Sequence, residues 1–236
     1  MSLKERFIFN FIDDNRWKYL WDGLGATLKV TFFALVVGVV IGVILAIIRS
    51  THDKNIKDMK GASKAILKVL DIIARVYLTV IRGTPVVVQL MIMYYVIMVS
   101  STNKVLVATI AFGFNSGAYV AEIFRSGIMA IDQGQFEAGR SLGFNFVQTM
   151  RYIIIPQAFK NVLPALANEF IVLLKETSVA GYVGVMDLTK AGDIIRGRTF
   201  SAFMPLIAVA LVYLALVMIL TYFVRLLERR LRKNER

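Results

Sequence analysis

Five long apolar segments leave this chain with very few possible folds. Apolar residues make up 57% of the 236 residues, and the mean hydropathy is +0.65. A helix of about 20 apolar residues spans the hydrocarbon core of a bilayer, and a soluble domain of this size does not bury so many such helices. We therefore predict an all-α, polytopic membrane helix bundle, a single domain over 1–236, with spans at 26–48, 65–98, 105–124, 159–179 and 203–224.

The distribution of basic residues predicts the orientation of this bundle. The net charge is +12, but Lys and Arg cluster beside apolar segments, as at 49–64 and 225–236, which is typical of membrane-flanking loops and not of a nucleic-acid surface. With the amino terminus outside, the inside segments hold 16 Lys and Arg residues and the outside segments hold 8. Because basic loops face the cytoplasm, we expect the amino terminus outside and a basic cytoplasmic tail at 225–236.

The remaining composition limits the chemistry. Segment 1–25 mixes charges with aromatic residues and lacks the apolar core of a signal peptide, so we expect it to lie at the membrane interface. The chain has no cysteine, and its only histidine, His52, stands in a charged loop where we expect it to be solvated. We predict no catalytic residue, no metal site and no cofactor in this chain.

The second span is interrupted. Residues 65–98 would form a straight helix of about 50 Å, but the sequence RGTP at 82–85 breaks it. Gly83 loosens the backbone, Thr84 is a natural N-cap, and Pro85 suits the first position of a second half-helix. The N–H groups of such a helix end attract a carboxylate. A simple proline kink is the alternative, but the polar Gln89 inside the membrane favours a binding role for 83–89.

The fourth span also carries polar residues inside an apolar run. These residues are Asn168, Glu169, Lys175, Glu176, Thr177 and Ser178. Two interrupted spans are typical of a solute site at the midplane of a transporter, whereas the alternative is an ion-pair network between helices. We expect Glu169 to receive a cationic substrate side chain, unless it pairs with Arg82 or with a second subunit. Glu122 and Arg125 are expected to pair with each other.

Residues 137–156, EAGRSLGFNFVQTMRYIIIP, are too polar for lipid and lie between two apolar spans. The pattern predicts a short helix at 137–142, a turn at Gly143 with positive φ, a second helix at 144–152, and a stop at Pro156. Apolar side chains on a polar body favour docking into another protein over packing against the chain's own bundle.

Several motifs in this order resemble the membrane subunits of ABC-type amino-acid importers, specifically the uptake permeases for histidine, arginine, glutamine and other polar amino acids. The resemblance extends from Gly25 to Glu228. The family pattern of EAA, three residues, Gly, and a later Ile-x-Leu-Pro appears here with Gly139 and Ile155 as mild departures. The other matching motifs are RGTPVVVQ at 82–89, GAYVAEIFRSGI at 117–128, PQAFKNVLPALANEFIVLLKETS at 156–178 and LLE at 226–228.

The resemblance implies a permease subunit in a prokaryotic plasma (inner) membrane. Its cytoplasmic coupling loop, 126–157, would dock onto an ATPase subunit that binds ATP and Mg²⁺, through Glu137, Ala138, Gly139, Arg140, Gly143 and Pro156. An identical or related second permease half and an extracytoplasmic solute-binding protein would complete the importer. Polar, basic L-amino acids are the expected substrates, and neutral ones such as glutamine are the alternative.

The sequence agrees with a non-enzymatic subunit, because no G-x-x-x-x-G-K-[ST] phosphate loop is present anywhere. Two other functions remain open. An ion-coupled secondary transporter would use the same intramembrane charges but has no need of a structured cytoplasmic loop. A membrane scaffold would leave the buried charges as a pure cost.

Overall fold

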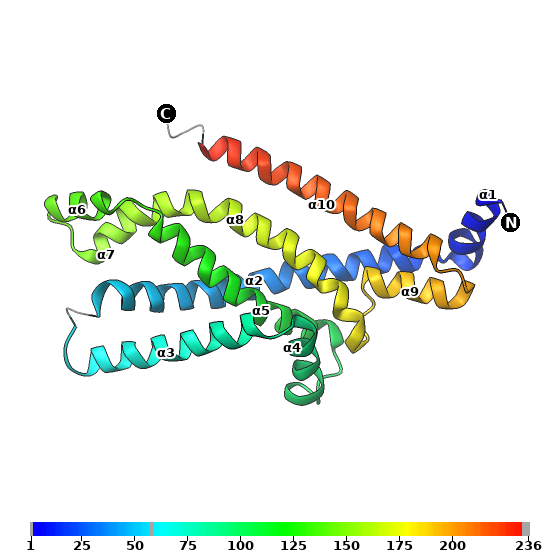
Figure 1. The fold of residues 1–236 in the computed structure, drawn as a ribbon, viewed down its shortest axis with the longest axis horizontal. Helices are drawn as coiled ribbons and strands as arrows, with labels where there is room; N and C mark the ends of the chain where they lie inside the picture. The colour runs from blue at the N-terminus through cyan, green and yellow to red at the C-terminus, as the bar shows by residue number, and fades with distance from the viewer. Residues whose placement is uncertain (1, 57–58, 233–236) are drawn as a thin grey trace.

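The computed structural model describes residues 2–56 and 59–232, and every regular element in these ranges is helical (Figure 1). The elements are α1 Leu3–Phe7, η1 Ile8–Ile12, η2 Asp13–Asn15, α2 Trp17–Asn55, α3 Gly61–Gly83, α4 Val86–Ile92, η3 Met93–Ile97, α5 Lys104–Met129, α6 Gln133–Ser141, α7 Phe146–Thr149, η4 Met150–Ile154, α8 Ile155–Glu176, η5 Thr177–Val183, α9 Leu188–Thr199 and α10 Phe203–Arg232. The predicted all-α class is confirmed for the described chain.

Three of these helices are long and apolar enough to cross a membrane, namely Trp17–Asp53, Lys104–Met129 and Phe203–Leu231. The pair Gly61–Gly83 and Val86–Ile97, which is bent by 111°, is a fourth candidate. The predicted fourth span, 159–179, corresponds to α8, which has 22 residues but carries several polar side chains. Three helices and one bent pair are therefore candidate spans, and a membrane crossing by α8 stays a prediction.

The short helices outside the candidate spans lie at two opposite ends of the bundle. Figure 1 places α1 and α9 at one end, and α6, α7 and the α2–α3 connection at the other. Two predicted boundaries change, however. Helix α2 begins at Trp17 instead of residue 26, because nothing in 17–25 breaks the helix. Helix α10 continues through Arg232, and the tail residues 233–236 lie outside the described residues.

The core forms around α5, which packs most extensively against α2. A Cβ atom on Gly42 of α2 would lie 2.5 Å from Val120, and one on Gly113 of α5 would lie 2.6 Å from Val37. Such close backbone approach needs small residues, as at other helix contacts inside membranes. Helix α10, by contrast, exposes Leu211, Leu214, Met218 and Ile219 along its length, as expected for a helix that faces lipid.

Candidate functional site

The break in the second span is confirmed, but its geometry differs from the prediction. Helix α3 ends at Gly83 after 23 residues, so it is a full-length helix and not a half-helix. The N-cap residue of α4 is Pro85, and the helix begins at Val86. Thr84 is not the N-cap, because its hydroxyl donates to the carbonyl oxygen of Val80 at 2.8 Å. The side chain therefore caps the end of α3 and not the start of α4.

Gln89 holds the break together. Its Nε2 atom donates to the carbonyl oxygen of Ile81 at 2.7 Å and to Oγ1 of Thr84 at 2.8 Å. Its Oε1 atom accepts a hydrogen bond of 2.9 Å from Nδ2 of Asn115, on α5. Gln89 thus satisfies backbone groups that the end of a helix leaves free, and it ties the break to the central helix.

Glu169 lies inside the bundle and not on its surface. Its side chain is 7% exposed, and its Oε1 atom accepts a hydrogen bond of 2.8 Å from Oγ of Ser116. Asn115 and Ser116 are adjacent on α5, so this helix contacts both predicted binding segments. Sequence reasoning missed these two residues, although a polar pair inside the apolar run AFGFNSGAYV is a visible signal.

The other predicted residues of the fourth span separate into two groups. Asn168 and Lys175 are exposed on α8, seven residues apart and so near one helical face. Thr177 is buried in η5, where its hydroxyl donates to the carbonyl oxygen of Leu174 at 2.8 Å. Ser178 is half-buried and lines a cavity of about 310 Å³ with residues of α9. The fourth span is therefore interrupted at Thr177, where the α-helix gives way to a 3-10 helix.

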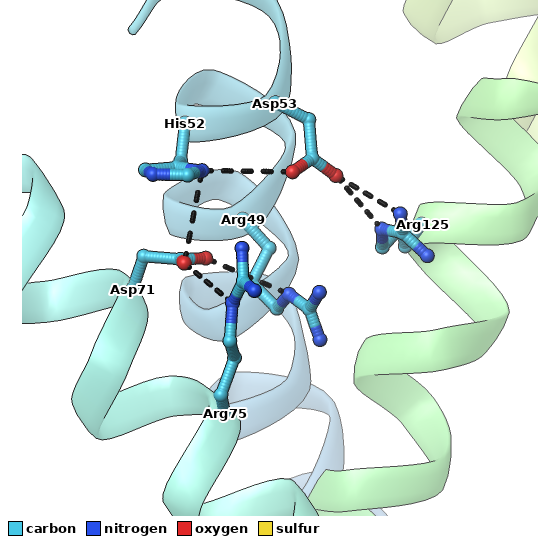
Figure 2. Close-up of polar contacts among 6 residues, drawn as sticks. All are labelled: Arg49, His52, Asp53, Asp71, Arg75 and Arg125. Carbon is cyan, nitrogen blue, oxygen red and sulfur yellow. Dashed lines mark hydrogen bonds and ion pairs between the residues drawn. The ribbon is translucent and has the colours of Figure 1, made fainter.

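The polar residues near the α2–α3 connection form a network that the sequence did not predict (Figure 2). The Nε atom of Arg75 donates to Asp71 at 2.6 Å, and Nε of Arg49 lies 3.7 Å from the same carboxylate. His52 Nδ1 lies 3.6 Å from Asp53 and 3.7 Å from Asp71, so the expectation of a merely solvated histidine is wrong. The His52 ring therefore contacts two carboxylates, one on α2 and one on α3.

The expected Glu122–Arg125 pair is also wrong. Arg125 donates to Oδ2 of Asp53 on α2, at 3.2 Å from Nε and 2.9 Å from NH2. Glu122 accepts a hydrogen bond from Arg82, on α3. Helix α3 passes beside α5 in this region, so each side chain finds a closer partner on a neighbouring helix. Arg82 is consequently not the partner of Glu169.

The segment 133–149, called here the coupling hairpin, forms the predicted helix–turn–helix. Helix α6 starts earlier than predicted, because Oδ1 of Asp132 accepts from the Gly134 N–H at 2.7 Å. Gly143 has φ +82°, which confirms the predicted left-handed turn. The N–H groups of Gly143 and Phe144 bond to the carbonyl oxygens of Arg140 and Gly139, at 2.9 and 3.0 Å. This is the hydrogen-bond pattern of a glycine-terminated helix.

The second helix of the hairpin contains a further correction. Asn145 caps α7 in a reciprocal pair with Gln148, and the chain stays helical from Phe146 to Glu176. Pro156 is not a stop, because it lies in the first turn of α8 directly after the wide π-turns of η4, where its missing N–H costs little. Gly139 is buried beneath Thr149, whereas Glu137, Ala138 and Arg140 are exposed.

Sequence reasoning did not predict helix α9, which lies between the predicted spans 159–179 and 203–224. Its signal was Asp187, whose carboxylate accepts from the N–H groups of Thr189 and Lys190 at 3.1 and 3.2 Å. Burial raises the pKa of Asp187, although these hydrogen bonds oppose the shift. The neighbouring Arg196 and Lys190 lower the pKa of Asp193.

Comparisons with known proteins agree with this architecture. Residues 61–233 match the family model described as binding-protein-dependent transport system inner membrane component. The putative glutamine transport system permease protein GlnP of Rickettsia bellii is 38% identical, over 90% of this chain and 93% of that protein. The arginine transport system permease protein ArtQ of Bacillus subtilis is 35% identical, over 92% and 94%.

A solved structure gives the same result in three dimensions. The protein described as an amino acid ABC transporter with histidines has a chain that is 40% identical and superposes with a TM-score of 0.81, over 93% of this chain and 98% of that chain. The family match over most of the sequence and the shared fold therefore agree with each other. This chain belongs to the family of binding-protein-dependent transport system inner membrane components.

Proposed function

We propose that this chain is the permease subunit of an ATP-driven importer that carries polar L-amino acids. The observation that carries the proposal is the coupling hairpin, which lies at one end of a membrane bundle and exposes Glu137, Ala138 and Arg140. A structured polar hairpin with these exposed side chains is suited to bind a partner protein. Two relatives named as glutamine and arginine transport permeases support the amino-acid class.

The proposed topology has five spans, with the amino terminus outside and the hairpin and carboxyl terminus in the cytoplasm of a prokaryote. Helix α8 is the fourth of the five spans of this multi-pass protein of the plasma membrane. Its exposed Asn168 and Lys175 would be costly against lipid. We therefore place this face of α8 toward a water-filled pathway shared with a second permease half, which is either identical or homologous.

The proposed energy source is a separate ATPase subunit that binds ATP and Mg²⁺ and receives the coupling hairpin. This chain has no phosphate-binding loop of the G-x-x-x-x-G-K-[ST] type, so it acts without catalytic residues of its own. An extracytoplasmic solute-binding protein delivers the amino acid to the end of the bundle that carries α1 and α9.

The proposed substrate site lies between the α3–α4 break and α8. Asn115 and Ser116 connect these two segments through Gln89 and Glu169. A basic substrate would need the Glu169 carboxylate, which in this structure is buried and accepts from Ser116. A neutral polar substrate such as glutamine would need no such charge. Which of the two is carried therefore depends on the role of Glu169.

Reconstitution tests the proposal. The chain would be assembled in proteoliposomes with its ATPase subunit and binding protein, and uptake of labelled amino acids would be measured with and without ATP. We expect uptake to require ATP and both partners. Uptake by this chain alone, driven by a proton or sodium gradient, would identify a secondary transporter and overturn the proposal.

The α3–α4 break has its own test in the same system. Replacing Gly83 and Thr84 together by Leu should extend α3 and close the site, so uptake is lost while ATP hydrolysis stimulated by the loaded binding protein survives. If this double variant imports amino acids with wild-type affinity, the break does not contribute to the site.

A further inference from the structure

Four arginine side chains from three helices surround one cavity of about 510 Å³ beside the α3–α4 break. They are Arg49 of α2, Arg75 and Arg82 of α3, and Arg125 of α5. The cavity also borders Thr79 and Gly83. Its volume lies in the range of small-molecule sites. Arg75 and Arg82 lie within the predicted span 65–98, where a guanidinium group is costly unless it has a use, whereas Arg49 and Arg125 directly follow the predicted spans 26–48 and 105–124.

The carboxylates of the bundle orient these arginines and do not fully neutralise them. Asp71 contacts Arg49 and Arg75, Asp53 contacts Arg125 (Figure 2), and Glu122 accepts from Arg82. Four guanidinium groups thus share three carboxylates. His52 lies within 3.7 Å of both Asp53 and Asp71 and so connects two of these acids.

The arginines keep donors free for a further anion. A guanidinium group has five N–H donors, and the hydrogen bonds described for Arg75 and Arg82 each use a single nitrogen. The side chains of Arg75 and Arg82 are 53% and 47% exposed. Guanidinium groups bind carboxylates through paired, charge-assisted hydrogen bonds, which lysine does not reproduce.

We propose that this cavity binds the carboxylate group of the transported amino acid, through the guanidinium groups of Arg75 and Arg82. The inference rests on the proposed function and deepens it, because it assigns recognition of the carboxylate to arginines of α3 next to Gly83. Arg49, Arg125 and the acids of Figure 2 position the site and keep its net charge positive.

The experiment measures protection of individual arginines in the transporter assembled with its ATPase subunit in phosphatidylcholine nanodiscs. Phenylglyoxal modifies accessible guanidinium groups, and mass spectrometry would quantify modification of Arg75, Arg82 and Arg196. Arg196 is a matched control, because it is exposed and pairs with Asp193 on α9, outside the cavity. The probes are L-glutamine, L-arginine, their α-carboxamides, which lack the carboxylate, and inorganic phosphate.

We expect the two amino acids to slow modification of Arg75 and Arg82 about tenfold, in line with the strength of charge-assisted hydrogen bonds, while Arg196 reacts unchanged. The carboxamides should give no protection. Arg75→Lys keeps the charge beside Asp71 but loses the paired donors, so protection of Arg82 by an amino acid should weaken in this variant.

Several results would overturn the inference. Equal protection by amino acids and carboxamides would show that the carboxylate is not the contact, and a lack of any reaction at Arg75 and Arg82 would show that the cavity is closed. Protection by inorganic phosphate but by neither amino acid, or only in nanodiscs with phosphatidylglycerol, would assign the cavity to phosphate or to lipid. ATP-dependent uptake, measured after the same purified transporter is reconstituted in proteoliposomes, separates these outcomes from failure of the proposed function.

Discussion

Replacement of Gly143 by valine should uncouple the permease from its ATPase subunit. Gly143 has φ +82°, and a Cβ atom built there has no heavy atom within 4 Å. Space is therefore not limiting, and the whole effect comes from the backbone. A residue with a Cβ atom in the left-handed region costs about 1–2 kcal/mol, and valine is stiffer than alanine because it is β-branched. A loss of about 1.4 kcal/mol changes an equilibrium tenfold.

The expected order of coupling is therefore Gly, then Asn, then Ala, then Val, because asparagine tolerates the left-handed region best among residues with a Cβ atom. The assay is amino-acid uptake per ATP hydrolysed in proteoliposomes, together with the amount of ATPase subunit that co-purifies. Gly197→Val is the control, because Gly197 also has open space but no positive φ. The reasoning is refuted if Gly143→Asn is as damaging as Gly143→Val, or if the valine variant retains normal uptake and subunit ratio.

Three further predictions concern packing and substrate choice. A Cβ atom on Gly139 would lie 2.6 Å from Cγ2 of Thr149, so Gly139→Ala should destabilise the hairpin by about 1–3 kcal/mol and reduce the amount of ATPase subunit that co-purifies. Adding Thr149→Ala to this variant should restore co-purification, and a failure to do so would show that the contact is irrelevant. Gly42→Leu should lower the stability of the detergent-solubilised protein in thermal unfolding by about 1–3 kcal/mol. Gly25→Leu should not, because Gly25 has open space around it. Equal losses of stability in the two variants would contradict the close-packing argument. In Glu169→Gln the new amide oxygen can still accept a hydrogen bond from Ser116, so the protein should fold. Competition assays should then show that the preference for basic over neutral amino acids is lost. An unchanged preference removes Glu169 from the substrate site.

The sequence predicted the helices and the breaks well, because both depend on local physics. Apolar runs form helices in a membrane, and RGTP cannot continue one. Gly143 was correctly expected to have a positive φ, since the helix before it needs a left-handed residue to end. The length of α2 was underestimated, because polar and aromatic residues before residue 26 are compatible with helix and only the apolar part was counted.

The partners of the polar side chains could not be predicted, because they depend on which helices meet. Glu122 and Arg125 have suitable spacing for a pair on one helix, yet each is drawn to a neighbouring helix. Asn115 and Ser116 looked like ordinary polar residues of an apolar span, and only the packing of α5 shows that they contact Gln89 and Glu169. The role of Thr84 also depends on a contact that the local sequence does not show. Its hydroxyl donates to α3 and at the same time accepts a hydrogen bond from Gln89.

The close contact between α2 and α5 determines which parts of the molecule can move during a transport cycle. A Cβ atom on Gly42 would collide with Val120, and one on Gly113 would collide with Val37, so the two helices are closely interlocked at both positions. These two helices should therefore move as one rigid body. Helix α3 is fastened to that body by exchangeable polar contacts, such as Arg82 to Glu122 and Tyr77 to the carbonyl oxygen of Phe114. Alternating access is consequently expected to come from displacement of α3 and the bent α4 against a fixed α2–α5 frame.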